Sequence, residues 1–137
     1  ELALESCARG GEIRTLKSGI DFSPYLYLSL ATHKADALAD CAKGAQTIVR
    51  RAPYLARAVG CSEEQIQELA KGHTDIGNIV TEQVIDKLTL GGTVKDCATK
   101  LEIIAGLGVE HVTLYPRGNK IPQVIDTFAR ELLSQFN

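Results

Sequence analysis

The chain has 137 residues, of which 45% are hydrophobic and 23% are charged, and its formal net charge is −2. This composition is that of a globular domain and excludes a disordered chain. Because basic residues do not outnumber acidic ones, the chain has no excess positive charge to attract a phosphate backbone, so no nucleic-acid partner is expected. No apolar run approaches the ~18 residues of a membrane span, and no signal peptide is visible. We therefore expect one cytoplasmic unit over residues 1–137, without a membrane partner.

The cysteine and methionine content bears on redox state and on processing. The chain has four cysteines, Cys7, Cys41, Cys61 and Cys97. No two of them form a C-x-x-C pair, and no histidine lies at metal-ligand spacing from any of them. Buried thiols in a reducing compartment are therefore expected, rather than disulfides, a metal centre or a catalytic thiol. The sequence contains no methionine and begins with Glu1. The simplest interpretation is that the natural chain starts before this residue.

The first predicted strand lies near the N-terminus. Residues 2–8 have the pattern of the end of an amphipathic helix, which two glycines then stop. Residues 25–31 form a short, apolar and aromatic-rich run, which predicts a strand buried on both faces of a parallel sheet. Pro24 fits at the start of this strand, because proline cannot donate to a strand ladder.

Helices are predicted for the middle of the chain. Apolar residues recur at helical spacing over residues 35–49, and Pro53 ends this helix and opens another. Residues 62–65 form a capping-box pattern, which predicts a further helix start. Residues 74–86 are expected to be helical in part.

The last third contains a second helix–strand–helix pattern. Residues 93–96 are expected to cap a helix with an apolar stripe over 94–105, which glycines end. Residues 109–115 predict a second strand, stopped by Pro116, and residues 121–136 predict a final helix. Because helices connect the two strands, the strands are expected to run parallel.

Two parallel strands do not complete a sheet. Parallel sheets are covered on both faces and usually contain more strands. The strand over residues 25–31 would have bare edges, which soluble proteins avoid. We therefore expect the chain to be incomplete on its own, with strands supplied from before Glu1 or by another chain. Complete pairing of both strands within this chain would overturn that expectation.

Two segments carry a resemblance to a known family. The run Gly92-Thr93-Val94-Lys95-Asp96, followed by Ile104-Ala105-Gly106-Leu107-Gly108-Val109-Glu110-His111-Val112, resembles the C-terminal end of luciferase-like oxidoreductases. In that family a Gly-Thr start, a helix and a glycine turn precede the last barrel strand. Residues 20–42 resemble the preceding strand and its helix. The resemblance covers most of the chain, is patchy between residues 60 and 82, and is nearest to methylene-tetrahydromethanopterin reductases that use a deazaflavin.

The resemblance implies a fold and an activity. The fold would be α/β, the C-terminal portion of a (β/α)8 TIM barrel with its last two strands and their helices. The complete protein would transfer hydride between a reduced deazaflavin and a small or one-carbon-carrier substrate. An FMN-dependent luciferase-like monooxygenase is the alternative within the family. Either cofactor would be bound mainly by parts outside this chain, so no catalytic residue is assigned to it.

Two further interpretations concern partners. The chain would meet the missing N-terminal barrel portion or another chain, and a homo-oligomer that completes the sheet is one alternative. An alternative of another class is a non-catalytic helical interaction module completed by a partner chain. The pairing state of the first strand and the mass of the protein in solution would separate these alternatives.

Arg117 and Ser29 are the candidate cofactor-binding residues. Arg117 and Lys120 follow the second strand, where a TIM barrel has its active-site mouth. A guanidinium matches phosphate geometry, so Arg117 is a candidate partner for an anionic part of a cofactor or substrate. Tyr25, Tyr27 and Ser29 alternate with leucines, which are expected to face the helices. Ser29 would then lie near the mouth, within reach of a flavin. The competing interpretation of Arg117 is an arginine in a solvated loop. That of Tyr25, Tyr27 and Ser29 is side chains that only fill the inside of the barrel.

The histidines do not indicate a metal site. His33, His73 and His111 are scattered, and no two of them are four residues apart on a helix. His33 is the one expected near the mouth, because it follows the first strand. No glycine-rich nucleotide-binding motif is present.

Overall fold

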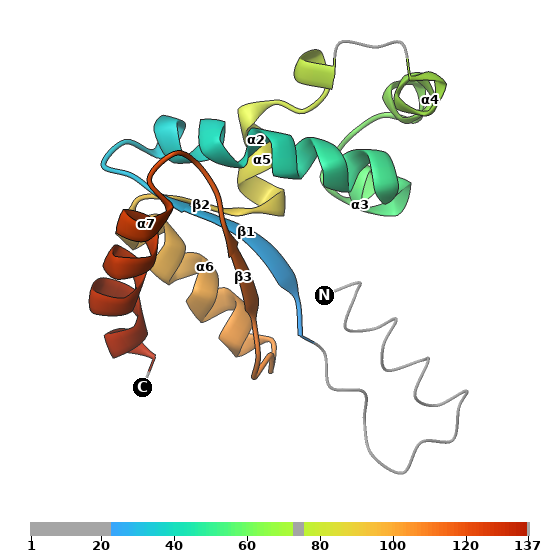
Figure 1. Ribbon diagram of the computed structural model, residues 1–137. Coiled ribbons are helices and arrows are strands. Elements are labelled where there is room, and N and C mark those ends of the chain that lie inside the picture. Colours follow the sequence, from blue (N-terminus) through green and yellow to red (C-terminus); the bar gives the residue numbers. More distant parts are fainter. Residues whose placement is uncertain (1–22, 73–75, 137) are drawn as a thin grey trace.

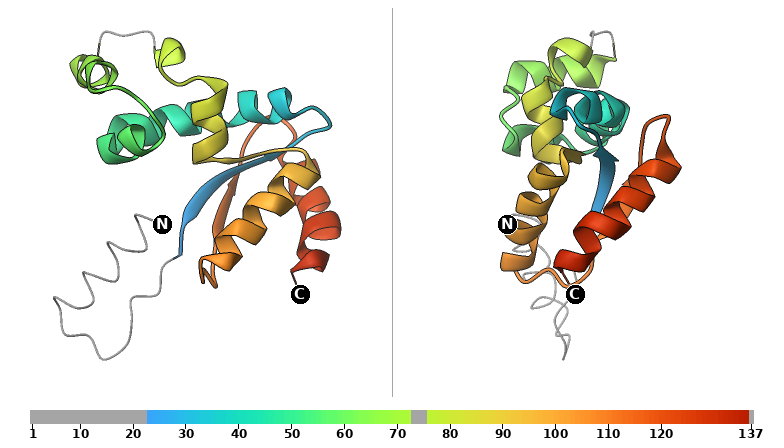
Figure 2. Two further views of the ribbon diagram at one scale, coloured as in Figure 1. Left: turned by 180° about the vertical axis from the view of Figure 1, so that it is seen from behind. Right: turned by 90° about the vertical axis from the view of Figure 1, so that its left-hand side faces the viewer.

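The computed structural model describes residues 23–72 and 76–136, which form a small α/β domain. Three parallel strands make an open sheet with helices on both of its faces (Figures 1 and 2), and no barrel is seen in this part of the chain. The predicted helix over residues 2–8, Cys7 and His73 lie outside the described residues.

The helices and strands agree largely with the sequence pattern. In chain order they are β1 (Tyr25–Leu30), α2 (Lys34–Arg51), α3 (Pro53–Ala58), α4 (Glu63–Lys71), the 3-10 turn η1 (Ile76–Asn78), α5 (Glu82–Leu88), β2 (Leu90–Gly92), α6 (Val94–Gly106), β3 (Thr113–Pro116), α7 (Ile121–Thr127), the π-helical turn η2 (Phe128–Leu132) and the 3-10 turn η3 (Leu133–Gln135). The predicted caps are confirmed, since Ser62 and Thr93 both form capping boxes.

The sheet differs from the prediction in its number of strands. Its order is β2-β1-β3, so β1 lies in the centre and pairs in parallel on both sides. Tyr25 to Leu28 face Thr113 to Pro116 of β3, and Leu28 to Leu30 face Leu90 to Gly92 of β2. The expectation that β1 has bare edges is therefore wrong. Within residues 23–72 and 76–136, the open edges are the outer sides of β2 and β3.

The second predicted strand is also shorter than expected. The prediction began it at Val109, whereas β3 begins at Thr113. The physical reason is the length of its partner, because Tyr25, the first residue of β1, already faces Thr113. The amide of Thr113 donates to the carbonyl of Pro24, and the described part of β1 offers no earlier partner to residues 109–112.

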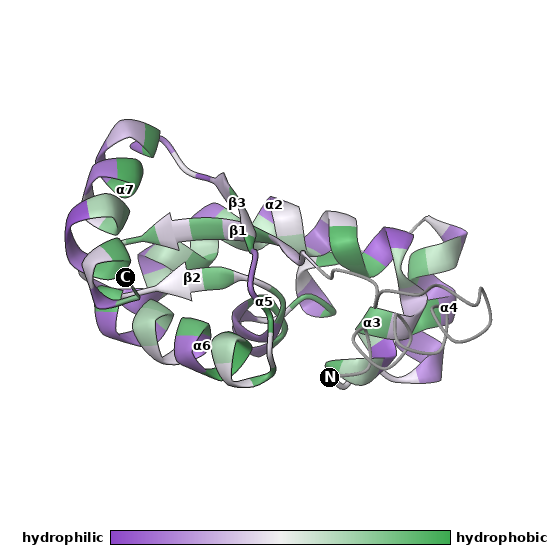
Figure 3. Ribbon diagram, turned by 90° about the horizontal axis from the view of Figure 1, so that it is seen from below, coloured by the Kyte–Doolittle hydropathy of each residue, from purple (hydrophilic) through white to green (hydrophobic). Residues whose placement is uncertain are grey.

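One face of the sheet, which we call the leucine face, packs against α6, α7 and η2. Its core consists of Leu28, Leu90, Cys97, Val124 and Leu132, all at most 3% exposed. Leu26, Leu30 and Leu114 pack around this core. Figure 3 shows hydrophobic residues along the strands and on the helices beside them. The prediction that the leucines of β1 face helices is confirmed.

The opposite face, which we call the tyrosine face, is covered by α2. The Ser29 hydroxyl donates to Asp40 Oδ2 at 2.8 Å, and Ser29 is 0% exposed. Gly44 of the same helix lies directly over the Tyr27 ring. Figure 2 shows α2 on the side of β1 opposite α6 and α7. The result is a sheet wound with helices on both faces rather than the wall of a hollow barrel.

A second apolar core lies among the helices α2 to α5, and Tyr27 of β1 packs against it. Its buried members include Leu38, Cys41, Ala45, Val49, Ala56, Ile66, Val84, Ile85 and Leu88. The apolar stripe of α2 is therefore turned mainly toward other helices. We call α2 to α5 the helical body.

Candidate functional site

The candidate site lies at the edge of the sheet where β1 and β3 end. From β1 the chain continues to β2 on one side of it, and later returns to β3 on the other side. The strand order therefore reverses between β1 and β3. In open α/β sheets, ligands bind at such a reversal, outside the carboxyl ends of the strands. Two adjoining hollows lie there, and both are lined by Asp40 and Asn119.

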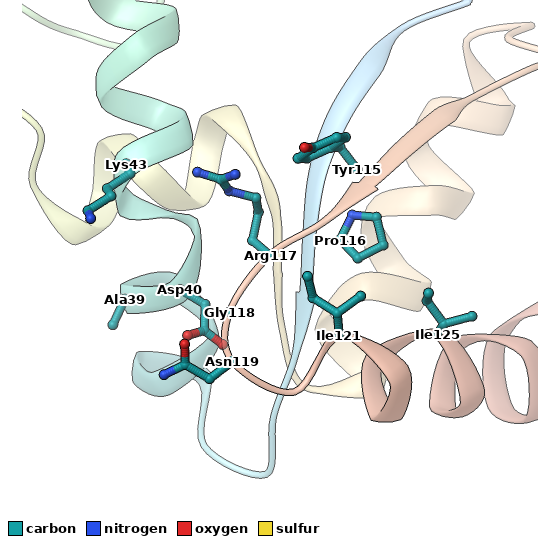
Figure 4. A pocket seen from close by; sticks show the side chains of 10 residues that line it. All are labelled: Ala39, Asp40, Lys43, Tyr115, Pro116, Arg117, Gly118, Asn119, Ile121 and Ile125. Carbon is teal, nitrogen blue, oxygen red and sulfur yellow. The ribbon is translucent and has the colours of Figure 1, made fainter.

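The first hollow, the tyrosine-side hollow, has a volume of about 590 Å³. It lies between α2 and the segment from the end of β3 into α7 (Figure 4). Its lining consists of Ala39, Asp40, Lys43, Tyr115, Pro116, Arg117, Gly118, Asn119, Ile121 and Ile125. Three charged groups and several apolar side chains thus share one depression, which suits a ligand that is partly apolar and partly charged.

The second hollow, the switch-point hollow, has a volume of about 690 Å³ and lies above the end of β1. Thr32, His33 and Asp36 line it from the start of α2, and Lys120 and Gln123 line it from the start of α7. His33 and Lys120, which the sequence placed at the mouth of a barrel, lie at the carboxyl end of this open sheet. His111, in contrast, precedes β3 at the other end of the strand.

Arg117 is held in place by backbone and by aromatic rings. Its amide donates to the carbonyl of Leu28 at 2.8 Å, which continues the pairing of β3 with β1. Its guanidinium carbon lies 5.2 Å from the centre of the Tyr27 ring and 5.6 Å from that of Tyr115. Both distances are within the range of a cation–π interaction. Arg117 is therefore not a freely solvated loop residue.

Tyr25 completes an aromatic cluster with these two rings. The Tyr25 ring centre lies 5.5 Å from that of Tyr27 and 5.9 Å from that of Tyr115. Tyr25 and Tyr115 are 50% and 48% exposed. The cluster occupies the part of the tyrosine face nearest the start of β1, and it stiffens the surroundings of Arg117.

Ser29 and Asp40 form the floor between α2 and the loop after β3. The Ser29 hydroxyl is fully buried and is already bonded to Asp40. A Cβ atom at Gly118 would collide with the Asp40 carboxylate, and Gly118 has a left-handed φ of 94°. Glycine is therefore required twice at this position, for conformation and for space. A direct contact between Ser29 and a cofactor would require α2 to move.

A charged cluster beside β2 joins the helical body to the rest of the domain. Lys100 Nζ donates to Asp86 Oδ1 at 2.7 Å and to the carbonyl oxygens of Asp86, Thr89 and Gly91. Lys34 donates to the other carboxylate oxygen of Asp86 at 2.9 Å. Although partial burial by itself would raise the pKa of Asp86, the hydrogen bonds from both lysines lower it below its usual value. The cluster is saturated with internal partners, so its role is structural.

The described cysteines behave as structural thiols, as predicted. Cys41, Cys61 and Cys97 are free and buried. Burial raises the pKa of the Cys41 thiol to about 11 and that of the Cys97 thiol to about 12. Both groups are therefore protonated at neutral pH and poor nucleophiles.

The described part of the chain contains neither a metal-binding cluster nor a membrane-spanning helix. Over residues 23–72 and 76–136 no group of three or more His, Cys, Asp or Glu side chains is placed to hold a metal ion. Nor does that part of the chain contain a helix with the length and apolarity needed to cross a membrane.

Only one side of the candidate site could be predicted from the sequence. Arg117 was predicted from its place after a strand. Asp40 and Lys43 were not, because on a helix of 18 residues they belong to an ordinary polar face. The signal that would have revealed them is Gly44, a glycine inside a helix, which indicates close approach of a neighbour.

Comparison with known proteins finds no relative of this chain. No protein-family profile matches the chain, and neither a curated protein sequence nor a solved structure is similar to it at a significant level. The resemblance to luciferase-like oxidoreductases therefore stays a prediction, and the fold and the site rest on the structure itself.

Proposed function

We propose that this chain is the C-terminal part of a luciferase-like oxidoreductase and supplies the last two strands of a (β/α)8 barrel. The observation that carries the proposal is the direct parallel pairing of β1 with β3, in register from Tyr25 to Leu28. Consecutive barrel strands pair in this way, and the loops after them meet at the active-site mouth. The complete protein would transfer hydride between a deazaflavin and a small or one-carbon-carrier substrate.

In this proposal the chain orients the cofactor and does not perform the chemistry. Arg117, fixed by two tyrosine rings beyond the end of β3, takes an anionic part of the cofactor or substrate. Ser29 lies one strand away, on the same face of the sheet as Tyr27. When the cofactor binds, it supplies the hydride chemistry, and the residues around it exclude water and hold it in place.

The position of α2 sets a condition on the proposal. The tyrosine face would line the inside of a barrel, but α2 covers it here. The open edges of β2 and β3 are where earlier strands would pair. We therefore propose that α2 lies against the tyrosine face in this chain alone and off it in the complete barrel.

The identity of the bound cofactor is tested on the complete protein. A visible absorption spectrum of the protein as purified distinguishes bound flavin from bound deazaflavin, because the two absorb at different wavelengths. Titration with each cofactor then gives its dissociation constant. We expect tight binding of one of them, and failure of both to bind would contradict the proposal.

The role of Arg117 is tested in the same titration. Arg117→Ala should raise the dissociation constant of the cofactor about tenfold or more, because a charge-assisted hydrogen bond is lost. Arg130→Ala is the matched control, since Arg130 is exposed and forms an ion pair with Asp126, four residues earlier. An unchanged constant for Arg117→Ala would remove this residue from the site.

A second candidate function is a stand-alone interaction module. The observation that favours it is the coverage of both sheet faces within this chain, which leaves only strand edges for a partner. An intact mass equal to that of 137 residues, in a protein that binds neither cofactor, would favour this candidate over the oxidoreductase.

A further inference from the structure

We infer that the tyrosine-side hollow binds a small organic carboxylate with an apolar body, through Arg117 and Lys43. This site exists only while α2 lies against the sheet, because Lys43 is on that helix. The inference therefore does not rest on the oxidoreductase proposal, which moves α2 away.

The guanidinium of Arg117 is held in position, but no acceptor among the described residues takes its N–H groups. Two tyrosine rings hold it, at 5.2 Å and 5.6 Å from their centres. Within residues 23–72 and 76–136 its side chain forms no hydrogen bond and no ion pair. All of its N–H donors remain available to a ligand, and the rings reduce the entropy that binding must overcome. Figure 4 shows the side chain rising from the loop after β3 toward α2.

The charges of the hollow select a monoanion. Its charged lining consists of Arg117 and Lys43 against Asp40, a surplus of one positive charge. The hydrogen bond from Ser29 holds the Asp40 carboxylate at the floor of the hollow. A carboxylate matches the forked geometry of a guanidinium and carries a single charge. A bound monoanion would bring the total charge of these groups to zero, whereas a phosphate dianion would leave it at −1.

Apart from Asn119, the rest of the lining is apolar, and much of it is exposed. Tyr115, Ile121 and Ile125 are 48%, 40% and 51% exposed, and Pro116 lies among them. These side chains form the wall of the hollow opposite α2 (Figure 4). A volume of about 590 Å³ is within the usual range for small-molecule sites. The apolar body of the ligand would cover this wall while its carboxylate reaches Arg117.

The test is an NMR titration of the 137-residue chain with benzoate as the probe. We expect benzoate to shift the amide signals of Lys43, Tyr115 and residues 117–121, and to bind more tightly than benzamide or inorganic phosphate. Benzamide has the same shape without the charge, and phosphate has the charge without the apolar body. Equal binding of benzamide or tighter binding of phosphate would overturn the inference, as would shifts confined to other parts of the chain.

Two variants locate the site. Arg117→Lys keeps the charge but loses the planar fork, and it should weaken benzoate binding about tenfold or more. Arg130→Lys is the control for an exposed arginine outside the hollow and should leave binding unchanged. The spread of amide signals shows whether each variant is folded. A folded Arg117→Lys variant that binds benzoate normally would contradict the inference. Cofactor binding by the complete protein is measured separately, so either proposal can fail alone.

Discussion

The two faces of the sheet are closed in opposite ways. On the leucine face, bulky apolar side chains from the three strands and from α6, α7 and η2 fill the space between them. On the tyrosine face, α2 approaches over the small residues Ser29 and Gly91 and presents Ala37, Asp40 and Gly44. The packing of the leucine face depends on the volume of large buried side chains. The packing of α2 on the tyrosine face depends on small residues that leave room for the helix. Large-to-small changes should therefore damage one face, and small-to-large changes the other.

The largest effect is expected on the leucine face. Leu28→Ala removes a side chain that is 2% exposed at the centre of the core, and it should lower the free energy of unfolding by about 2–5 kcal/mol. Urea denaturation measures this change. Ile103→Ala is the control, because Ile103 is 61% exposed, and it should change stability by less than about 0.5 kcal/mol. Similar losses for both variants would mean that this face is not the main core.

The link between the helical body and the sheet should come next. Lys100→Met removes the donor that bridges Asp86 with the backbone of β2 and should cost about 1–3 kcal/mol, since four oxygen atoms lose a partner. Lys95→Met, at an exposed position of the same helix, is the control.

The same bridge predicts a pH dependence. The pKa of Asp86 is lowered in the folded state, so its ion pairs stabilise the fold at pH values above its ordinary pKa of 3.8. This contribution is lost as the pH falls through the lowered value. The stability difference between the wild type and Lys100→Met should therefore be present at pH 6 and shrink below about pH 4. A difference that does not depend on pH in this range would contradict the ion pairing.

A smaller effect is expected for Ser29, next to Leu28 but on the other face. Ser29→Ala removes one hydrogen bond and should cost about 0.5–1.5 kcal/mol, because the freed Asp40 carboxylate can still meet water. Thermal or urea unfolding measures the change. A loss as large as that of Leu28→Ala would show that the tyrosine face is closed as firmly as the leucine face.

The sequence predicted the parts of the fold that depend on local chemistry. Pro24 marked the start of β1, and the side chains of Ser62 and Thr93 marked two helix starts, because caps and proline act within a few residues. β2 was missed, since a three-residue strand with two glycines has no strand propensity and forms only where β1 offers it partners.

The position of α2 could not be predicted for a related reason. Its apolar stripe indicated one buried side, and that side packs in the helical body. The side against the sheet carries Asp40 and Gly44, which a pattern of hydrophobic residues does not register. For the candidate site, only the residues after β3 could therefore be expected, and their partners on α2 required the tertiary structure.

Gly44 provides the most direct test of whether α2 closes over the tyrosine face. In a helix free of neighbours, Gly44→Ala should raise stability by about 1 kcal/mol, because alanine is the better helix former. Here a Cβ atom at this position would lie 2.5–2.8 Å from three atoms of the Tyr27 ring, so the substitution should instead lower stability by about 1–3 kcal/mol.

The same substitution in a Tyr27→Ala background removes the collision and should become neutral or stabilising. Urea denaturation of the wild type, the two single variants and the double variant measures this reversal of sign. A destabilising effect that disappears with the Tyr27 ring is the predicted result. A stabilising Gly44→Ala in the presence of Tyr27 would show that α2 does not lie against the sheet.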